Sequence, residues 1–244
     1  MSHRYSKLQI ALTKFYRQFF PVPKSPWTKG KVDDICKIQL VPPEILESFF
    51  EQALKTIGRE GDYLEFGVFN GSSIGSMALT AKRLNKSMRL FGFDAFEGLP
   101  PGAEKEDDGV WEKGFYACSY EAMRNCLKRR DIDPDSITWV KGWYHETLTP
   151  ELAKQHNFDP AIVFIDCDTY SSSKTVLDFL APLITKPTIL CFDDWKLNDL
   201  DVKEMGEYKA FNEFLDEQRF EAKEIKSYNR KSKTFILRTR SNNN

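Results

Sequence analysis

The chain has 244 residues, of which 41 % are hydrophobic and 29 % charged, and its formal net charge is −1. Such a length can bury a substantial core, and the composition is ordinary for a soluble globular protein. A net charge near zero creates no global field that would attract nucleic acid or anionic lipid, so we expect no nucleic acid and no membrane as partners. Apolar runs stay well below the about 18 residues of a membrane span, and no hydrophobic signal core follows Met1. We therefore expect a cytoplasmic protein.

The first 60 residues predict helices. Apolar spacing indicates one helix over residues 5–20, and a proline-bearing loop follows it. A second helix is expected to begin near Pro42 and Pro43, because proline is tolerated in the first helical turn, and to end at Gly58. We treat residues 1–60 as an N-terminal helical extension and residues 61–244 as one α/β domain.

A strand, a glycine turn and a helix follow over residues 62–84. Residues 62–66 form the near-continuous apolar run of a buried parallel strand, and residues 72–84 carry apolar side chains at helical spacing. The turn between them contains glycines, which let the backbone come close to a ligand. This order is typical of the first unit of a nucleotide-binding sheet. The expected ligand contacts in the turn are Gly67, Val68, Asn70, Gly71 and Ser72.

The rest of the chain continues the alternation. Strands are expected at residues 88–93, 137–140, 161–165 and 188–192, and helices at residues 119–130, 150–155, 172–181 and 205–217. The last two strands, at about 220–228 and 234–238, have a connection too short for a parallel crossover and should be antiparallel. The pattern predicts an α/β, Rossmann-like class I methyltransferase fold. Its seven-stranded sheet is mostly parallel and ends in an antiparallel C-terminal strand pair.

One connection, residues 94–118, is unusually long. It carries the acidic run 104–108 together with Trp111, Phe115 and Tyr116, which makes it too aromatic for a disordered linker. Loops of this length inside compact domains are usually functional lids or binding loops. We expect residues 96–118 to close over the site.

The cysteines give a hint about the compartment. They are odd in number, show no metal-type spacing, and two of them, Cys167 and Cys191, lie in apolar strand patterns where a free thiol acts as a small hydrophobe. This usage favours a reducing compartment.

Glu65 narrows the choice of ligand. A dinucleotide places its pyrophosphate at the glycine turn, where a carboxylate would repel it. S-adenosylmethionine has no phosphate and carries a positive sulfonium and ammonium group, so Glu65 points to this methyl donor. The absence of Gly-x-Gly-x-x-Gly also counts against the nearest rival, a nicotinamide-dependent oxidoreductase. A non-catalytic glycan-binding protein with the same fold is a further alternative.

Asp94 ends the second strand. A carboxylate about 20 residues past the glycine turn accepts the ribose hydroxyl protons in dinucleotide folds, and Asp94 fits that separation, although it could instead cap the next segment.

Phe96 or Trp143 could stack on the adenine ring or serve as core residues. His145, just past the third strand, could accept a proton or be a surface residue. Whether His145 or an acid of the 96–118 loop assists catalysis stays open.

Acids also follow two later strands. Asp166 and Asp168 come after one, and Asp193 with Asp194 after the next, so all should meet at one rim of the sheet. Negative charges packed together repel one another unless a cation compensates them. Oxygen ligands without a nearby histidine suit Mg²⁺. The alternative is that Asp193 and Asp194 cap the following turn and Asp168 forms an Asx-turn.

With these residues in view, the chain resembles the macrocin O-methyltransferase family. The resemblance runs from about Gly61 to Trp195, and four blocks carry it: residues 61–68 (GDYLEFGV), 93–100 (FDAFEGLP), 141–148 (KGWYHETL), and 165–172 (IDCDTYSS) with 192–195 (FDDW).

The resemblance implies an S-adenosylmethionine- and Mg²⁺-dependent O-methyltransferase. Its acceptor would be a hydroxyl, in particular a sugar hydroxyl, of a glycosylated or nucleotide-linked small molecule. The metal aspartates of the family match Asp166, Asp193 and Asp194, and Asp166 also matches its general base. The first 60 residues, which help to form the acceptor pocket, do not follow the family pattern. Related sheets often pair through their N-terminal helices, so a homo-oligomer is possible.

Overall fold

The computed structural model describes residues 34–218 and 220–240. The predicted helix 5–20 and the proline-bearing loop after it lie outside the described residues. The second predicted helix is present as α2 (Pro43–Ile57), with proline in its first turn and Gly58 as a left-handed C-cap. Its buried face shares one hydrophobic core with the sheet. The division of the chain at residue 60 stays a prediction.

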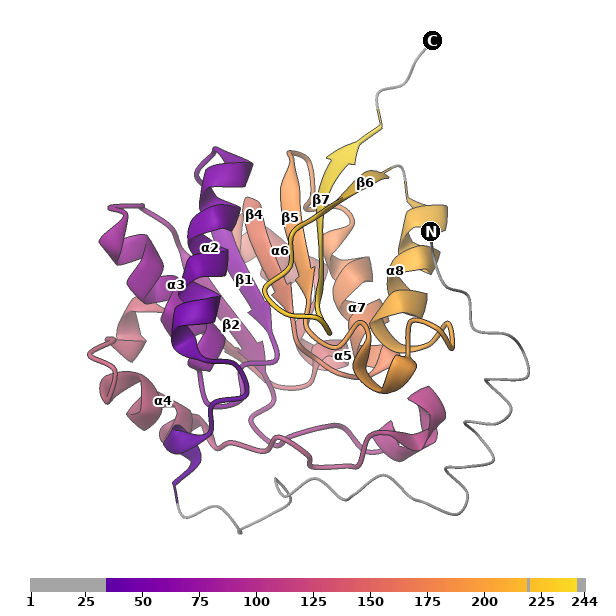
Figure 1. Cartoon of the computed structure of the whole chain (residues 1–244), viewed down its shortest axis with the longest axis horizontal. Helices are drawn as coiled ribbons and strands as arrows, with labels where there is room; N and C mark the ends of the chain where they lie inside the picture. The colour runs from indigo at the N-terminus through magenta and orange to yellow at the C-terminus, as the bar shows by residue number, and fades with distance from the viewer. Residues whose placement is uncertain (1–33, 219, 241–244) are drawn as a thin grey trace.

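The sheet has the predicted seven strands in the order β3-β2-β1-β4-β5-β7-β6 (Figure 1). The first five are parallel to one another, and β7 is antiparallel to both β5 and β6. This arrangement confirms the predicted fold class. The strands are β1 (Asp62–Phe66), β2 (Leu90–Asp94), β3 (Thr138–Lys141), β4 (Pro160–Ile165), β5 (Thr188–Phe192), β6 (Phe220–Ile225) and β7 (Lys233–Thr239).

Helices cover both faces of the sheet. Successive strand residues point to opposite faces, so Tyr63 packs into the core beneath α2, α3 and α4, whereas Leu64 packs into the core beneath α7 and α8. Burial on both faces explains why β1, β4 and β5 read as continuous apolar runs. The remaining helices are α3 (Ser72–Arg83), α4 (Tyr120–Lys128), α5 (Tyr144–Thr147), α6 (Pro150–His156), α7 (Tyr170–Leu180) and α8 (Gly206–Glu217).

Element ends differ from the predictions by one or two residues in most cases. Helix α7 begins at Tyr170 instead of residue 172, because the Thr169 side chain accepts a hydrogen bond from the Ser172 N–H and caps it. Helix α5 was not predicted, since four residues are too few to show a helical period. Short 3-10 turns lie at Ile35–Lys37, Ala103–Lys105, Asp107–Gly109, Pro134–Ser136 and Leu197–Asp199.

A disulfide joins Cys36, before α2, to Cys126 of α4. It argues against the expected reducing compartment, because such bonds persist mainly in oxidising surroundings. The sequence could not show this pairing, since the two residues are 90 positions apart. Cys118, Cys167 and Cys191 are free and buried. Among the described helices, none is long and apolar enough to cross a membrane.

Candidate active site

A cleft of about 630 Å³ opens at the carboxyl ends of the parallel strands. Ligands of open α/β sheets bind at this edge, where the chain leaves one strand and crosses to the next. Its walls come from the turn after β1, from the ends of β2 to β5, and from the lid, the name used below for residues 96–118. The predicted site residues that line it are Gly67, Asp94, Trp143, Asp166, Asp193 and Asp194.

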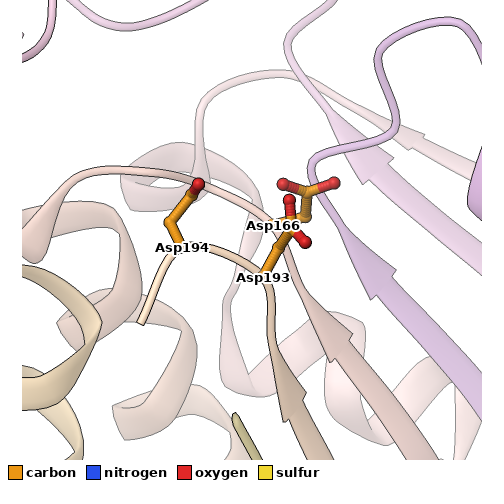
Figure 2. Close-up of side chains that lie close together, drawn as sticks. All are labelled: Asp166, Asp193 and Asp194. Carbon is orange, nitrogen blue, oxygen red and sulfur yellow. The ribbon is translucent and has the colours of Figure 1, made fainter. Parts of the chain in front are cut away.

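Three aspartates meet on the floor of the cleft (Figure 2). One carboxylate oxygen each of Asp166, Asp193 and Asp194 lies within 4.8 Å of the others. The backbone sets this arrangement: Asp166 N donates to the Phe66 carbonyl at 2.8 Å, and Asp193 N donates to the Ile165 carbonyl at 3.1 Å. The strand ladder thus continues into both acidic segments and brings the carboxylates together, as the sequence predicted.

The carboxylates of this cluster repel one another when they are all ionised. Burial raises the pKa of Asp166 and of Asp194 well above the usual range, and repulsion by Asp193 and Asp168, respectively, adds to this effect. Burial likewise raises the pKa of Asp193 to about 6 and that of Asp168 to about 8. Buried carboxylates in contact favour a shared proton or a bound cation.

Asp168 belongs to the same cluster. Its backbone is left-handed, with φ 64°, and its carboxyl group contacts that of Asp194. The alternative role considered for it, shaping the turn before α7, is carried by Thr169, which caps the helix. Asp168 therefore adds a fourth carboxyl group to the floor of the cleft.

Gly67 and Asp94 shape the turn beside the cluster. Gly67 has φ +88°, and its backbone passes so close to the carbonyl of Asp166 that no side chain fits. The Asp94 carboxylate accepts hydrogen bonds from the N–H groups of Val68 at 2.7 Å, Phe69 at 3.1 Å and Phe96 at 2.6 Å. Asp94 thus fixes the turn and is also one of the residues that line the cleft.

Glu65 lies behind the turn instead of in the cleft. It is fully buried and accepts hydrogen bonds from the Tyr63 hydroxyl, from Ser73 Oγ at 2.7 Å and from the Ile74 N–H. Burial raises its pKa to about 8. Because its carboxylate oxygens face the start of α3, Glu65 ties β1 to that helix. It does not line the cleft, as a residue in direct contact with the methyl donor would.

A smaller cavity of about 50 Å³ adjoins the cleft, and Asp166 and Asp193 line both. The predicted residues Val68, Asn70 and Ser72 line this cavity. The Asn70 amide donates to the carbonyls of Ile35 at 3.0 Å and Ile38 at 2.9 Å, which fastens the segment before α2 to the glycine turn.

The other predicted residues have different positions. Gly71 is the left-handed N-cap of α3 and lines neither cavity. Phe96 packs against Tyr120 and Trp139 as a core residue, whereas Trp143 reaches the cleft. The side chain of His145 is 74 % exposed at the cleft mouth and lies 3.7 Å from the Glu146 carboxylate.

Two tyrosines of the site were not among the predicted contact residues, although Tyr116 belongs to the loop expected to close over the site. Tyr116, in the lid, packs edge-on against Phe69 and lines the cleft; burial, and then the charges of the aspartates, raise its pKa. Tyr228, between β6 and β7, lines the smaller cavity, and its buried hydroxyl has no hydrogen-bond partner among the described residues. For Tyr116 the aromatic loop was the available signal, whereas nothing local in the sequence marks Tyr228.

Several known proteins are similar to this chain. A 4'-O-methyltransferase from Streptomyces olivaceus, named for 8-demethyl-8-(2,3-dimethoxy-alpha-L-rhamnosyl)-tetracenomycin-C, is 26 % identical over 148 residues. The alignment covers 58 % of this chain and 55 % of that protein, so it spans about half of the relative.

Two solved structures share the fold. The O-methyltransferase NovP matches with a TM-score of 0.65 and 20 % identity, over 81 % of this chain and 79 % of its own. The calicheamicin methyltransferase CalS11 matches with a TM-score of 0.62 and 19 % identity, over 95 % of this chain and 94 % of its own. Residues 45–225 match the family described as macrocin O-methyltransferase (TylF). Because this match covers well over half of the chain, the protein belongs to the macrocin O-methyltransferase family.

Proposed function

We propose that the protein is an S-adenosylmethionine-dependent O-methyltransferase that uses Mg²⁺. Its acceptor is a hydroxyl of a sugar in a glycosylated or nucleotide-linked small molecule. The observation that carries the proposal is the meeting of Asp166, Asp193 and Asp194 on the floor of a cleft beside a glycine turn. Family membership supports the reaction class, and the rhamnosyl compound in the name of the Streptomyces relative supports a sugar acceptor.

The aspartate cluster suits a hard divalent cation. All donors are carboxylate oxygens that lie within 4.8 Å of one another, and their partly buried charges need compensation. Asp166, Asp193 and Asp194 would hold Mg²⁺. When bound, the cation supplies positive charge that favours loss of the proton from an acceptor hydroxyl.

The cleft also suits a cationic donor without phosphate. The turn at Gly67 allows close approach, Asp94 presents a carboxylate to a ribose, and Trp143 offers an aromatic surface to adenine. The amino-acid end of the donor fits the smaller cavity, where the start of α3, Ser72 and the Tyr228 hydroxyl can donate to a carboxylate. Glu65 contributes indirectly by holding the turn against α3.

In this proposal the residues of the chain align the reactants and move one proton. S-adenosylmethionine supplies an electrophilic methyl group, and Asp166 accepts the proton of the acceptor hydroxyl. The lid, with Phe115 and Tyr116 in the cleft wall, excludes water. Alignment of two bound reactants can lower a barrier by roughly 7–11 kcal/mol, so positioning contributes more than base strength.

The segment before α2 supports a role of the N-terminal extension in acceptor binding. Leu40 lines both cavities and is 53 % exposed, which leaves an apolar surface at the cleft mouth. We therefore assign the acceptor wall to the 1–60 extension and the donor and metal sites to the domain 61–244.

The test is a methyl-transfer assay with labelled donor and a panel of nucleotide sugars and glycosides, with Mg²⁺ or with EDTA. We expect a labelled product with at least one sugar and its loss in EDTA. Donor binding without transfer to any panel member would favour a non-catalytic glycan-binding protein. Binding of a nicotinamide cofactor in place of the methyl donor would favour the oxidoreductase alternative.

A further inference from the structure

The acidic run of the lid is mostly exposed, but one of its residues is buried. Asp107 is only 7 % exposed, although it lies in the middle of the run 104–108. Its carboxylate accepts three hydrogen bonds: from the Tyr170 N–H at 2.8 Å, from the Gly206 N–H at 2.8 Å and from Trp111 Nε1 at 3.2 Å. One buried side chain therefore has contacts with three separate parts of the chain.

Two of these contacts are at helix starts. Tyr170 is the first residue of α7 and Gly206 the first of α8. The first N–H groups of a helix have no partner within it, and they carry the positive end of the helix dipole. The residue before α8, Met205, provides no side-chain cap. Asp107 therefore caps α8 from 99 positions away in the sequence and binds α7 with the same carboxylate.

The same helix starts adjoin the aspartate cluster. Tyr170 lies two positions after Asp168. In α8, Glu207 follows Gly206 directly, is 1 % exposed, and accepts a hydrogen bond from the Asp194 N–H at 2.9 Å. A continuous path of contacts thus runs from the lid through Gly206 and Glu207 to Asp194 (Figure 1 shows α7 and α8 side by side).

We propose that Asp107 is a positioning residue that couples the lid to the aspartate cluster. By capping α8 it holds the lid over the cleft, and through Glu207 the same helix start fixes the backbone of Asp194. An opening of the lid at Asp107 then loosens the Asp194 segment as well. The contacts that carry this coupling do not depend on which acceptor the site takes.

Glu106 offers a matched control. It is also acidic, stands next to Asp107, and accepts hydrogen bonds from Ser171 N and Ser171 Oγ, each at 2.8 Å. Its contacts reach α7 and not α8. Glu106→Gln therefore removes the same charge and weakens the same lid without touching the path to Asp194.

The experiment is hydrogen–deuterium exchange, read by mass spectrometry on the full chain. Asp107→Asn replaces one accepting oxygen with a donor group, so we expect exchange to rise about tenfold both in the lid and in residues 193–207, in line with the loss of one capping bond. Glu106→Gln should raise exchange in the lid and at the start of α7 and leave residues 193–207 within about twofold. The proposal is overturned if Asp107→Asn affects the lid alone, or if both variants loosen residues 193–207 equally.

A second measurement needs no variant and covers the case in which Asp107→Asn does not fold. Hydrogen exchange of the wild-type chain is measured at a series of increasing but sub-denaturing denaturant concentrations. The lid and the start of α8 should open together as one cooperative unit, so their exchange rates should depend on denaturant in the same way. Separate openings, with the lid exchanging well before Gly206, would contradict the coupling. Neither measurement uses donor, acceptor or metal, so a failure here is distinct from a failure of the proposed function.

Discussion

A Cβ atom on Gly67 would lie 1.7 Å from the carbonyl oxygen of Asp166. The backbone of the turn after β1 and that of the segment after β4 therefore touch at this point, and only glycine allows it. Since Asp166 is also the proposed base, the absence of a side chain at Gly67 sets how near the turn after β1 can come to this proton acceptor.

Replacement of Gly67 by alanine should be severely destabilising. The new methyl group meets backbone, which cannot rotate away, and we expect a loss of more than about 4 kcal/mol in the free energy of unfolding, or no folding at all. Gly102→Ala is the matched control, because Gly102 also has a positive φ, of +98°, but open space around it. In that variant the free energy of unfolding should fall by only about 1 kcal/mol. Urea unfolding of both proteins measures the difference, and similar losses would refute the steric argument.

Asp166→Asn should abolish turnover and leave the affinity for S-adenosylhomocysteine within a few-fold of the wild-type value. An amide cannot accept the hydroxyl proton, and a general base contributes about 10²- to 10⁴-fold to a rate. Calorimetry with S-adenosylhomocysteine gives the affinity, and the labelled-donor assay gives the rate. Asp178→Asn, an exposed acid of α7 paired with Lys174, should leave both unchanged. Turnover near the wild-type rate in Asp166→Asn would remove this residue from the mechanism.

Mg²⁺ should stabilise the protein more at about pH 8 than at about pH 5.5. Asp193 and Asp168 have pKa values of about 6 and about 8 in the folded chain, above the usual value for aspartate, so the folded state binds more protons between about pH 4 and pH 8. The free energy of unfolding of the metal-free protein must then fall as pH rises through that window. A cation offsets the repulsion only where the carboxyl groups are ionised.

The measurement is the Mg²⁺-induced change in melting temperature at the two pH values. Because buried Glu65 also has a raised pKa, of about 8, the comparison with and without the metal isolates the cluster. In Asp194→Asn, most of the Mg²⁺-induced rise in melting temperature at about pH 8 should be lost. An equal stabilisation at both pH values would count against metal binding by these aspartates.

Tyr228→Phe should weaken binding of S-adenosylhomocysteine about tenfold or more, since a hydrogen bond to a charged group is worth about 1.5–3 kcal/mol. Binding of 5'-methylthioadenosine, which lacks the amino-acid end, should stay unchanged. Calorimetry with both ligands separates a local contact from a general loss of structure. Tyr208→Phe, at a tyrosine that packs against Trp195 and lines neither cavity, is the control. Equal weakening of both ligands would mean that Tyr228 acts only through packing.

The sequence predicted those parts of the site that depend on one local pattern and the geometry of a parallel sheet. Asp166, Asp193 and Asp194 each end a buried apolar run, and parallel strands bring such ends to one edge. It was not predictable in this way that the Glu65 side chain points toward α3 and away from the cleft, because this depends on how α3 packs behind the turn.

Contacts between distant segments had no local signal. The sequence shows Asp107 only as one acid of the run in the predicted lid, and the fold places it against helix starts 63 and 99 positions away. Tyr228 likewise becomes part of the site only because the connection between β6 and β7 passes beside the strand ends. Helix and strand positions were predicted well because burial on both sheet faces leaves a clear apolar pattern.

The Cys36–Cys126 bond has a practical consequence for biochemical work. Cys36 precedes Leu40 by four positions, so the crosslink anchors the stretch that we propose as the outer wall for the acceptor. Protein purified in thiol reductant and protein purified without it are therefore two different samples: with the disulfide reduced, this stretch keeps its hydrogen bonds to Asn70 but loses its covalent link to α4. A substrate survey should therefore be made on both samples.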